Sequence, residues 1–157
     1  MSPALRIRPL QAADLPAVFQ VRIATWHNDN GAAELTALGI TIESTTRLLQ
    51  TSYQGWVCEV DQQIVGFAMG NADVGEMWVI AVLPEFEGSG IGRQLLQHVE
   101  DWLFETWSEI WLTTDTDENF RAVGFYRHLG WQDWKLADGD RYMKKVRSAT
   151  RDTGASV

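Results

Sequence analysis

The stretch Val79-Ile-Ala-Val-Leu-Pro-Glu-Phe-Glu-Gly-Ser-Gly-Ile-Gly-Arg93 carries the most information about the fold. It begins as an apolar strand, is stopped by a proline, and passes through a turn that contains Gly88, Gly90 and Gly92. Apolar residues from Ile91 onward recur at helical spacing, so a helix opens directly from the turn. Glycines allow close approach of a ligand, and amides at a helix N-terminus bind anions. The stretch therefore predicts a phosphate site, the alternative being a tight turn without a ligand.

The spacing of these glycines argues against two common nucleotide-binding turns. A nucleotide P-loop requires a glycine, four residues and then Gly-Lys-Ser/Thr, and no such string occurs. A dinucleotide turn requires Gly-x-Gly-x-x-Gly, whereas here the third glycine comes one residue early and Arg93 follows it. A nucleotide-binding α/β domain is therefore the weaker interpretation.

Composition sets the class of protein. The chain has 157 residues and a net charge of −8, with 45% hydrophobic and 22% charged residues, which is typical of one globular domain. Such an acidic surface repels phosphates, so we expect no nucleic acid and no membrane as partner. The single cysteine, Cys58, excludes an internal disulfide and a cysteine-based zinc cage. Because we find no signal peptide and no membrane-length apolar run, we expect a cytoplasmic protein.

Hydrophobic periodicity predicts one mixed α/β domain over residues 4–147, followed by a disordered tail at 148–157. The expected strand 76–82 is apolar throughout, which predicts a central strand covered on both faces. The pattern of residues 32–40 is weak and leaves a helix or a loop open. The other expected elements are strands near 5–8, 56–60, 64–69, 109–114, 131–136 and 142–146, and helices over 14–26, 41–49, 91–103 and 119–129.

Two segments resemble the motifs of one known family, the GCN5-related N-acetyltransferase (GNAT) superfamily. Residues 84–96, PEFEGSGIGRQLL, resemble its acyl-CoA motif, and residues 119–131, NFRAVGFYRHLGW, resemble its second motif. The motifs occur in the expected order about a strand apart, and the predicted elements match that fold over residues 4–147. The resemblance implies an α/β (α+β), single-domain acyl-CoA N-acyltransferase fold. In that fold a mixed, mostly antiparallel sheet has helices on both faces and splays at its central strand.

The resemblance implies acetyl-CoA as acyl donor and no metal. The backbones of Ile80 and Val82 would pair with the pantetheine arm, and Asn119 would touch that arm. Seven consecutive amides would cradle the pyrophosphate, those of Glu87, Gly88, Ser89, Gly90, Ile91, Gly92 and Arg93. Glu87 departs from the family, which usually has Arg or Gln there. Its charge should weaken binding unless the side chain points away or Arg93 offsets it.

Two residues are candidates for acid–base catalysis. The resemblance implies that Tyr126 protonates the CoA thiolate, a role that suits a neutral phenol. The alternative for Tyr126 is a core aromatic residue beside Phe125. Glu76 is the candidate base, because some histone acetyltransferases of the superfamily have their base glutamate at the matching point. The alternative for Glu76 is a surface residue at a strand end.

The acceptor side is the least predictable part. Trp26 lies in the helix–loop region that shapes the acceptor pocket in the superfamily, and Asp115 follows a strand that ends near the expected site. Asp115 would bind a cationic amine, or else cap the following helix. Trp78 and Trp111 either line an aromatic pocket or fill the core.

We expect an enzyme that acetylates a small-molecule or peptide amine by direct attack in a ternary complex. The alternative on the same fold is a non-catalytic acyl-CoA-binding regulatory module. Dimers are common in the superfamily, so a homodimer through the tryptophan-rich C-terminal strands is one expected assembly.

Overall fold

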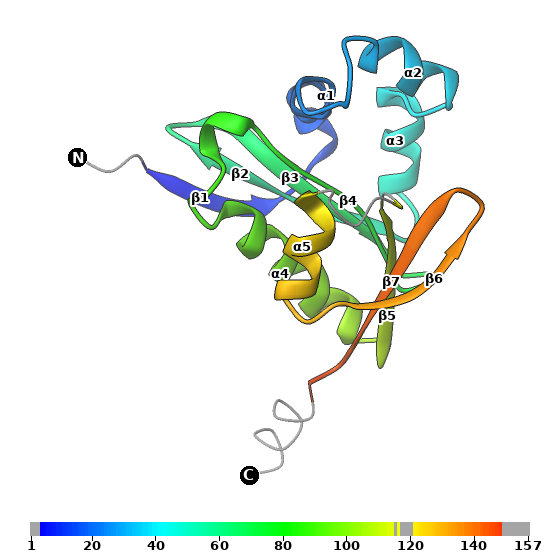
Figure 1. Ribbon diagram of the computed structural model, residues 1–157. Coiled ribbons are helices and arrows are strands. Elements are labelled where there is room, and N and C mark those ends of the chain that lie inside the picture. The colour runs from blue at the N-terminus through cyan, green and yellow to red at the C-terminus, as the bar shows by residue number, and fades with distance from the viewer. Residues whose placement is uncertain (1–3, 115, 117–120, 149–157) are drawn as a thin grey trace.

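The computed structural model describes residues 4–114, 116 and 121–148 of the chain (Figure 1). Among these residues the strands form a seven-stranded sheet in the order β1-β2-β3-β4-β5-β7-β6. The strands are β1 Leu5–Pro9, β2 Tyr53–Val60, β3 Gln63–Asn71, β4 Glu76–Val82, β5 Glu109–Thr114, β6 Gln132–Ala137 and β7 Asp140–Val146. The α-helices are α1 Leu15–Ala24, α2 Gly31–Ala37, α3 Ile42–Leu49, α4 Ile91–Phe104 and α5 Arg121–His128, with short 3₁₀ turns at Ala12–Asp14 and Pro84–Phe86.

Helices lie on both faces of this sheet. Figure 1 shows α1, α2 and α3 on one side and α4 and α5 on the other. On the first face, apolar residues of α1 such as Leu15 and Val18 pack with Phe67 and Met69 of β3. On the second face, a larger cluster joins α4, α5 and the strands; its fully buried members include Leu95, Leu96, Val99, Ile110 and Leu112. The amphipathic pattern of each helix therefore sets the layer it occupies.

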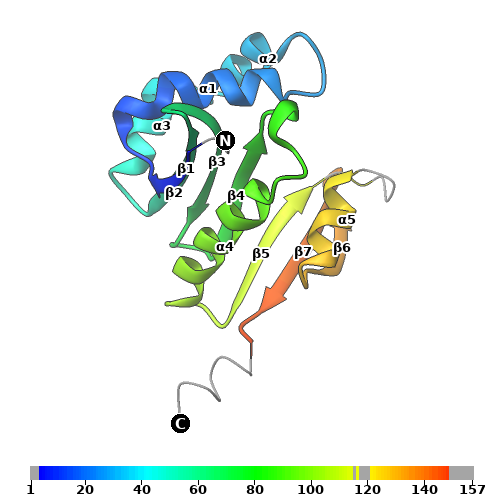
Figure 2. The same cartoon turned by 90° about the vertical axis from the view of Figure 1, so that its left-hand side faces the viewer.

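The sheet splays where β4 meets β5. β4 pairs with β3 in antiparallel fashion along its length, from Asn71 opposite Glu76 to Gly66 opposite Val82. Its parallel pairing with β5 is confined to Glu76 and Trp111. Figure 2 shows the two arrows diverging from this point toward their C-terminal ends. The predicted fold, including the splay at the central strand, is confirmed.

A β-bulge re-aims the side chains of β4. Val79 lies opposite Met69 and Met77 lies opposite Gly70, so Trp78 is an extra residue without a counterpart on β3. As a result Trp78 and Val79 both pack on the α1 face, whereas Met77 belongs to the cluster under α4. Such bulges change which face a side chain occupies. Glu76 and Trp78 share this face through the ordinary alternation of the strand, and the bulge adds Val79 to it.

Two expectations need correction, and one open alternative is decided. β4 is central, but only Met77 of its side chains is buried, because β5 diverges and leaves one flank open. Of the helix and the loop left open for residues 32–40, the structure has the helix α2 over residues 31–37. The last hairpin is longer than expected and begins after Trp131, which instead lies in the core. Residues 149–157, most of the predicted tail, lie outside the described residues.

Candidate active site

The turn between β4 and α4 offers a run of unpaired backbone amides. The first helical hydrogen bond of α4 runs from Gln94 N–H to the carbonyl of Gly90, and no side chain caps the helix. None of the hydrogen bonds found among the described residues uses the amides from Gly88 to Arg93, but the amide of Glu87, the first of the seven expected donors, is already paired with the Pro84 carbonyl at 3.2 Å. The Ser89 hydroxyl donates to the Phe86 carbonyl at 2.5 Å, and this hydrogen bond stabilises the turn. This N-terminus therefore keeps its donors and its positive dipole end available for an anion.

Backbone geometry explains two of the three glycines. Gly88 has φ +81° and Gly90 has φ +85°, the left-handed region that other residues rarely adopt. A Cβ at Gly88 would meet nothing within 4 Å, and one at Gly90 would meet only the Gln94 side chain at 3.9 Å. The turn is therefore held open by conformation and leaves room for a ligand. Gly92 is different, because a Cβ there would lie 3.5 Å from Phe125 Cζ in ordinary contact.

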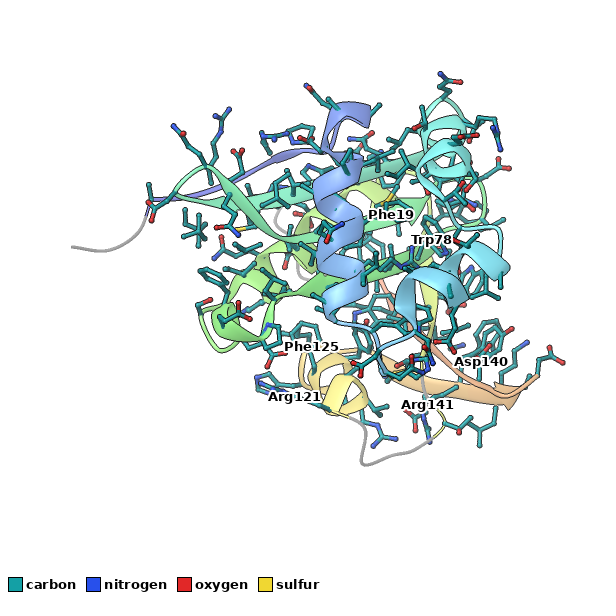
Figure 3. All side chains as sticks on the ribbon, turned by 90° about the horizontal axis from the view of Figure 1, so that it is seen from above. Phe19, Trp78, Arg121, Phe125, Asp140 and Arg141 are labelled. Atoms are coloured by element: carbon teal, nitrogen blue, oxygen red, sulfur yellow. The ribbon has the colours of Figure 1, made fainter. Side chains whose placement is uncertain are left out.

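Glu87 is neutralised from α5. Its carboxylate accepts a hydrogen bond of 2.6 Å from Arg121, which stands at the first position of that helix. Arg93, the offsetting charge that the sequence suggests, forms no ion pair with any described residue. Figure 3 shows Arg121 and Phe125 projecting from the same helix. The acidic residue in the phosphate turn is thus matched by a basic residue on the neighbouring element.

The open flank of β4 presents unpaired backbone groups. In an antiparallel pair, alternate residues bond to opposite neighbours. Leu83 N–H donates to the Val65 carbonyl on β3 at 2.8 Å, so Val82 and Ile80 direct their backbone groups away from β3 and toward the diverging β5. Both residues are partly buried members of the cluster under α4. An extended ligand could therefore add to β4 here as a strand would.

Tyr126 is in the core. Its side chain is 6% exposed and packs between Phe125 and Trp131, with ring centroids at 5.5 and 6.1 Å. Burial raises the pKa of the phenol well above its ordinary value. Its hydroxyl forms no hydrogen bond with a described residue.

A buried ionic cluster fixes the C-terminal end of α5. Glu100 of α4 is 3% exposed and accepts from Trp131 Nε1 at 2.9 Å and from Lys145 Nζ at 2.7 Å. Lys145 also donates to the Leu129 carbonyl at 2.8 Å, and Trp131 N–H donates to the Tyr126 carbonyl at 3.0 Å. The position of Tyr126 is therefore coupled to α4 and β7 through paired charges.

Glu76 lies with aromatic residues on the α1 face. It is half-buried at the start of β4, and burial raises the pKa of its carboxyl. The pKa of Tyr53 on β2 is also raised, first by burial and then by the charge of Glu76. The Tyr53 ring meets the Trp78 ring edge-on at 5.3 Å, and the guanidinium of Arg22 lies 5.2 Å from the Trp78 ring centroid. A carboxylate poised to accept a proton thus sits at one end of an aromatic surface.

The remaining candidates are only partly placed. Trp26 follows α1 and donates from Nε1 to Glu34 at 2.7 Å, which ties the end of α1 to α2. Asp115 and Asn119 lie outside the described residues. Trp111 stacks on Tyr142 at 5.8 Å and donates to the Val74 carbonyl at 2.9 Å, on the sheet surface rather than in the core.

Sequence reasoning missed three residues of this region. Arg121 pairs with Glu87, which is 34 positions away in the chain, and Tyr53 interacts with Glu76, which is 23 positions away. No local sequence pattern identifies either residue. Arg22 is the one charged residue in the helix α1, and that charge is the available signal.

In the described part of the chain, no group of three or more His, Cys, Asp or Glu side chains is arranged to hold a metal ion. None of the helices described there has the length and apolar character needed to cross a membrane.

The chain is similar to acetyltransferases in sequence. The sequence profile of the acetyltransferase (GNAT) family matches residues 16–131. An uncharacterized N-acetyltransferase of Methanocaldococcus jannaschii is 33% identical over 84 residues, which are 52% of this chain and 54% of that protein. The mycothiol acetyltransferase of Pseudarthrobacter chlorophenolicus is 36% identical over 67 residues, which are 40% of this chain and 20% of that protein. The match thus spans about half of the first relative and a fifth of the second.

Solved structures share the fold at low sequence identity. The PaiA N-acetyltransferase from Thermoplasma acidophilum, in complex with coenzyme A, has a TM-score of 0.77 and 18% identity, covering 91% of this chain and 99% of that one. The ribosomal-protein-S18-alanine N-acetyltransferase from Escherichia coli has a TM-score of 0.71 and 21% identity, covering 92% and 95%. At these identities the likeness establishes the fold alone.

Proposed function

The chain belongs to the acetyltransferase (GNAT) family, and on that premise we propose that it transfers an acetyl group from acetyl-CoA to a primary amine. The observation that carries the proposal is the continuity of two binding surfaces. The unpaired flank of β4 at Ile80 and Val82 runs directly into the turn whose amides are free from Gly88 to Arg93. A ligand with an extended arm that ends in a pyrophosphate matches this arrangement, with the arm along the strand flank and the pyrophosphate at the free amides.

The residues present fit acetyl-CoA. Backbone amides and a helix dipole suit a pyrophosphate, and the strand flank suits the amide groups of pantetheine. The pairing of Glu87 with Arg121 removes the objection that an acidic residue in the turn would repel phosphate. The complex of the PaiA relative with coenzyme A supports this assignment. Asn119 keeps its proposed contact with the cofactor arm.

We assign the proton transfers to two side chains. The amine nitrogen attacks the thioester carbon, and the carbon–sulfur bond breaks to release the CoA thiolate. Glu76 takes the proton that the nitrogen loses, directly or through water, and its raised pKa favours that step. Tyr126 gives a proton to the thiolate; burial keeps its phenol neutral and able to donate. Direct transfer requires no cysteine nucleophile, and Cys58 is buried in the core.

The acceptor we propose is an amine of a small molecule or a peptide. Trp26 at the end of α1 and Asp115 at the end of β5 are the proposed acceptor contacts. The surface that Tyr53 and Trp78 form beside Glu76 supports the placement of the amine on the α1 face.

One observation favours a second function. Tyr126 is 6% exposed, so a non-catalytic acyl-CoA-binding regulatory module on the same fold would also suit the structure. In that case the turn would bind acyl-CoA as a signal, and no amine would be consumed.

Two measurements test the proposal. Acetyl-CoA is incubated with a panel of polyamines, aminoglycosides, amino acids and basic peptides, and thiol release is followed. Calorimetry measures the binding of CoA, NAD and ATP, with Gly90→Glu as the control that blocks the turn. Thiol release with at least one amine supports the enzyme, and CoA binding without turnover supports the module. Binding of NAD or ATP without CoA would overturn both.

We also propose a homodimer in the cytoplasm. β6 is an edge strand, and its Trp134 and Leu136 are 46% and 62% exposed. Exposed apolar side chains on a sheet edge are typical of contact surfaces. Sedimentation of the wild type and of Leu136→Glu tests the dimer.

A further inference from the structure

Arg22 is a half-buried cation that lacks an acidic partner. It lies in the last turn of α1, and its guanidinium lies 5.2 Å from the Trp78 ring centroid. Its guanidinium forms no hydrogen bond and no ion pair with any residue that the structure describes. Burial lowers its pKa to about 10, which reflects the poor solvation of the charge.

Internal contacts account for the charge of Arg22 but not for its donors. The C-terminal end of a helix favours a cation, and an indole face attracts one. Neither contact accepts hydrogen bonds from the N–H groups of the guanidinium. These N–H groups form a fixed fork whose geometry matches the two oxygens of a carboxylate. Arg8, a part-buried arginine on β1, is by contrast paired with Asp14 at 2.8 Å. The acceptors for Arg22 are therefore expected from outside the chain.

The surroundings of Arg22 place it beside the proposed base. Trp78 touches Arg22 and also meets Tyr53, and Tyr53 senses the charge of Glu76. Glu76 and Trp78, two positions apart on β4, lie on the same face of the strand. The face thus presents a carboxylate at one end, an aromatic surface in the middle and a cation at the other end. A molecule with an amine and an anionic group matches that order.

We propose that Arg22 is a specificity-determining residue that binds a carboxylate of the acceptor, so that the acceptor is an aminocarboxylate whose amine and carboxylate are separated by a carbon chain. This inference rests on the proposed acetyltransferase function. It also agrees with the net charge of −8. An acidic protein repels an anion, but an aminocarboxylate is a zwitterion without net charge, and Arg22 supplies the local attraction.

The test uses matched pairs of acceptors. Each of a series of aminocarboxylates with carbon chains of different length is compared with its carboxamide, which keeps the amine and lacks the carboxylate, and polyamines are included. For the wild type we expect kcat/KM with the best aminocarboxylate to exceed that with its carboxamide by about ten- to a hundredfold, as for a charged hydrogen-bonded contact. Arg22→Gln should lose this preference through a higher KM for the acceptor, with the KM for acetyl-CoA unchanged. Arg22→Lys should keep part of it.

Arg47→Gln is the control, because Arg47 is an exposed arginine on the adjacent helix α3 and the change of charge is the same. It should behave as the wild type. If Arg22→Gln fails to fold, the inference is tested by the preference of the wild type for aminocarboxylates over their carboxamides and by the reduction of that preference in Arg22→Lys. Equal rates with aminocarboxylates and carboxamides, or a preference for polyamines, would overturn the inference and leave the acetyltransferase proposal intact. An effect of Arg22→Gln on the KM for acetyl-CoA alone would also overturn it. No thiol release with any amine would instead refute the proposed function.

Discussion

The Glu87 carboxylate and the Arg121 guanidinium, 2.6 Å apart, link the phosphate turn to α5 across the ends of the diverging strands. The side chain of Arg121 is 79% exposed, so the pair contributes little to the stability of the fold. Its effect is on local charge, because it places a cation beside the turn. The pair therefore sets the electrostatic potential at the turn where we propose that the pyrophosphate binds.

Substitutions in this pair should change acetyl-CoA binding in opposite directions. Glu87→Gln removes a negative charge and releases Arg121, so we expect the KM for acetyl-CoA to fall by up to about fivefold, the range for an exposed ion pair. Arg121→Gln leaves Glu87 unpaired and should raise that KM by a similar factor. Both shifts should shrink at 0.5 M salt, where exposed charges are screened. Steady-state kinetics at two salt concentrations checks this, and a higher KM for Glu87→Gln would contradict it.

The two glycines that flank Ile91 should differ in their tolerance of alanine. Gly90 has φ +85°, so Gly90→Ala should cost about 1–2 kcal/mol in the free energy of unfolding. Gly92 is helical, and its added Cβ would make ordinary contact with Phe125 at 3.5 Å, so Gly92→Ala should be neutral or slightly stabilising. Urea denaturation of the two variants measures the difference. Equal losses of stability would show that the turn does not depend on the left-handed conformation.

Local signals predict the elements well and the site only in part. β4 spans Glu76–Val82 as expected, because a glycine turn precedes it and a proline follows it. The bulge at Trp78 depends on the register with β3, and register is a property of two strands together. The helix at Gly31–Ala37 carries a weak pattern, and the hydrogen bond from Trp26 to Glu34 holds it to the preceding helix. Contacts between segments that are distant in the sequence therefore cannot be predicted from local sequence patterns.

Tyr126→Phe tests the proposed acid with little disturbance of the core. The hydroxyl makes no hydrogen bond to a described residue, so the variant should keep the stability of the wild type within about 0.5 kcal/mol. Loss of the proton donor should lower kcat by about a hundredfold or more, the usual contribution of general acid catalysis. Burial raises the pKa of the phenol above its ordinary value of 10.0, so wild-type kcat should show no loss of this acid up to about pH 10. Unchanged turnover in Tyr126→Phe would remove the assignment.

The ion pair between Glu100 and Lys145 should be costly to break from one side. Lys145→Met leaves the buried Glu100 carboxylate with Trp131 as its remaining described donor. Removing one partner of a buried pair costs about 3 kcal/mol, and we expect that loss in chemical denaturation. Lys144→Met is the matched control, because Lys144 meets the exposed Glu109 at 3.6 Å and should cost less than about 1 kcal/mol. Similar losses in both variants would mean that Glu100 does not depend on Lys145.

We expect the ionised Glu76 carboxylate to lower the stability of the fold while it serves catalysis. The sign of its effect on the free energy of unfolding follows from its pKa. Burial raises the pKa of the folded carboxyl above its ordinary value of 4.5, so the folded state holds the proton more tightly than the unfolded state. The contribution of Glu76 to the free energy of unfolding is therefore lost as the pH rises above 4.5, and the ionised carboxylate destabilises the folded state at pH 7. Glu76→Gln removes this destabilising charge. We expect it to unfold at the same or a higher urea concentration than the wild type at pH 7, with kcat lower by about a hundredfold.

The pH profile separates that role from a structural one. Wild-type kcat should fall on the acidic side with a midpoint above 4.5, and this limb should vanish in Glu76→Gln. Glu109→Gln, which alters an exposed carboxylate on the neighbouring strand β5, should leave the limb in place. A structural glutamate would behave in the opposite way, because its removal would lower the urea midpoint and keep both kcat and the acidic limb. Activity and stability measured on the same two variants therefore decide whether Glu76 serves the reaction or the fold.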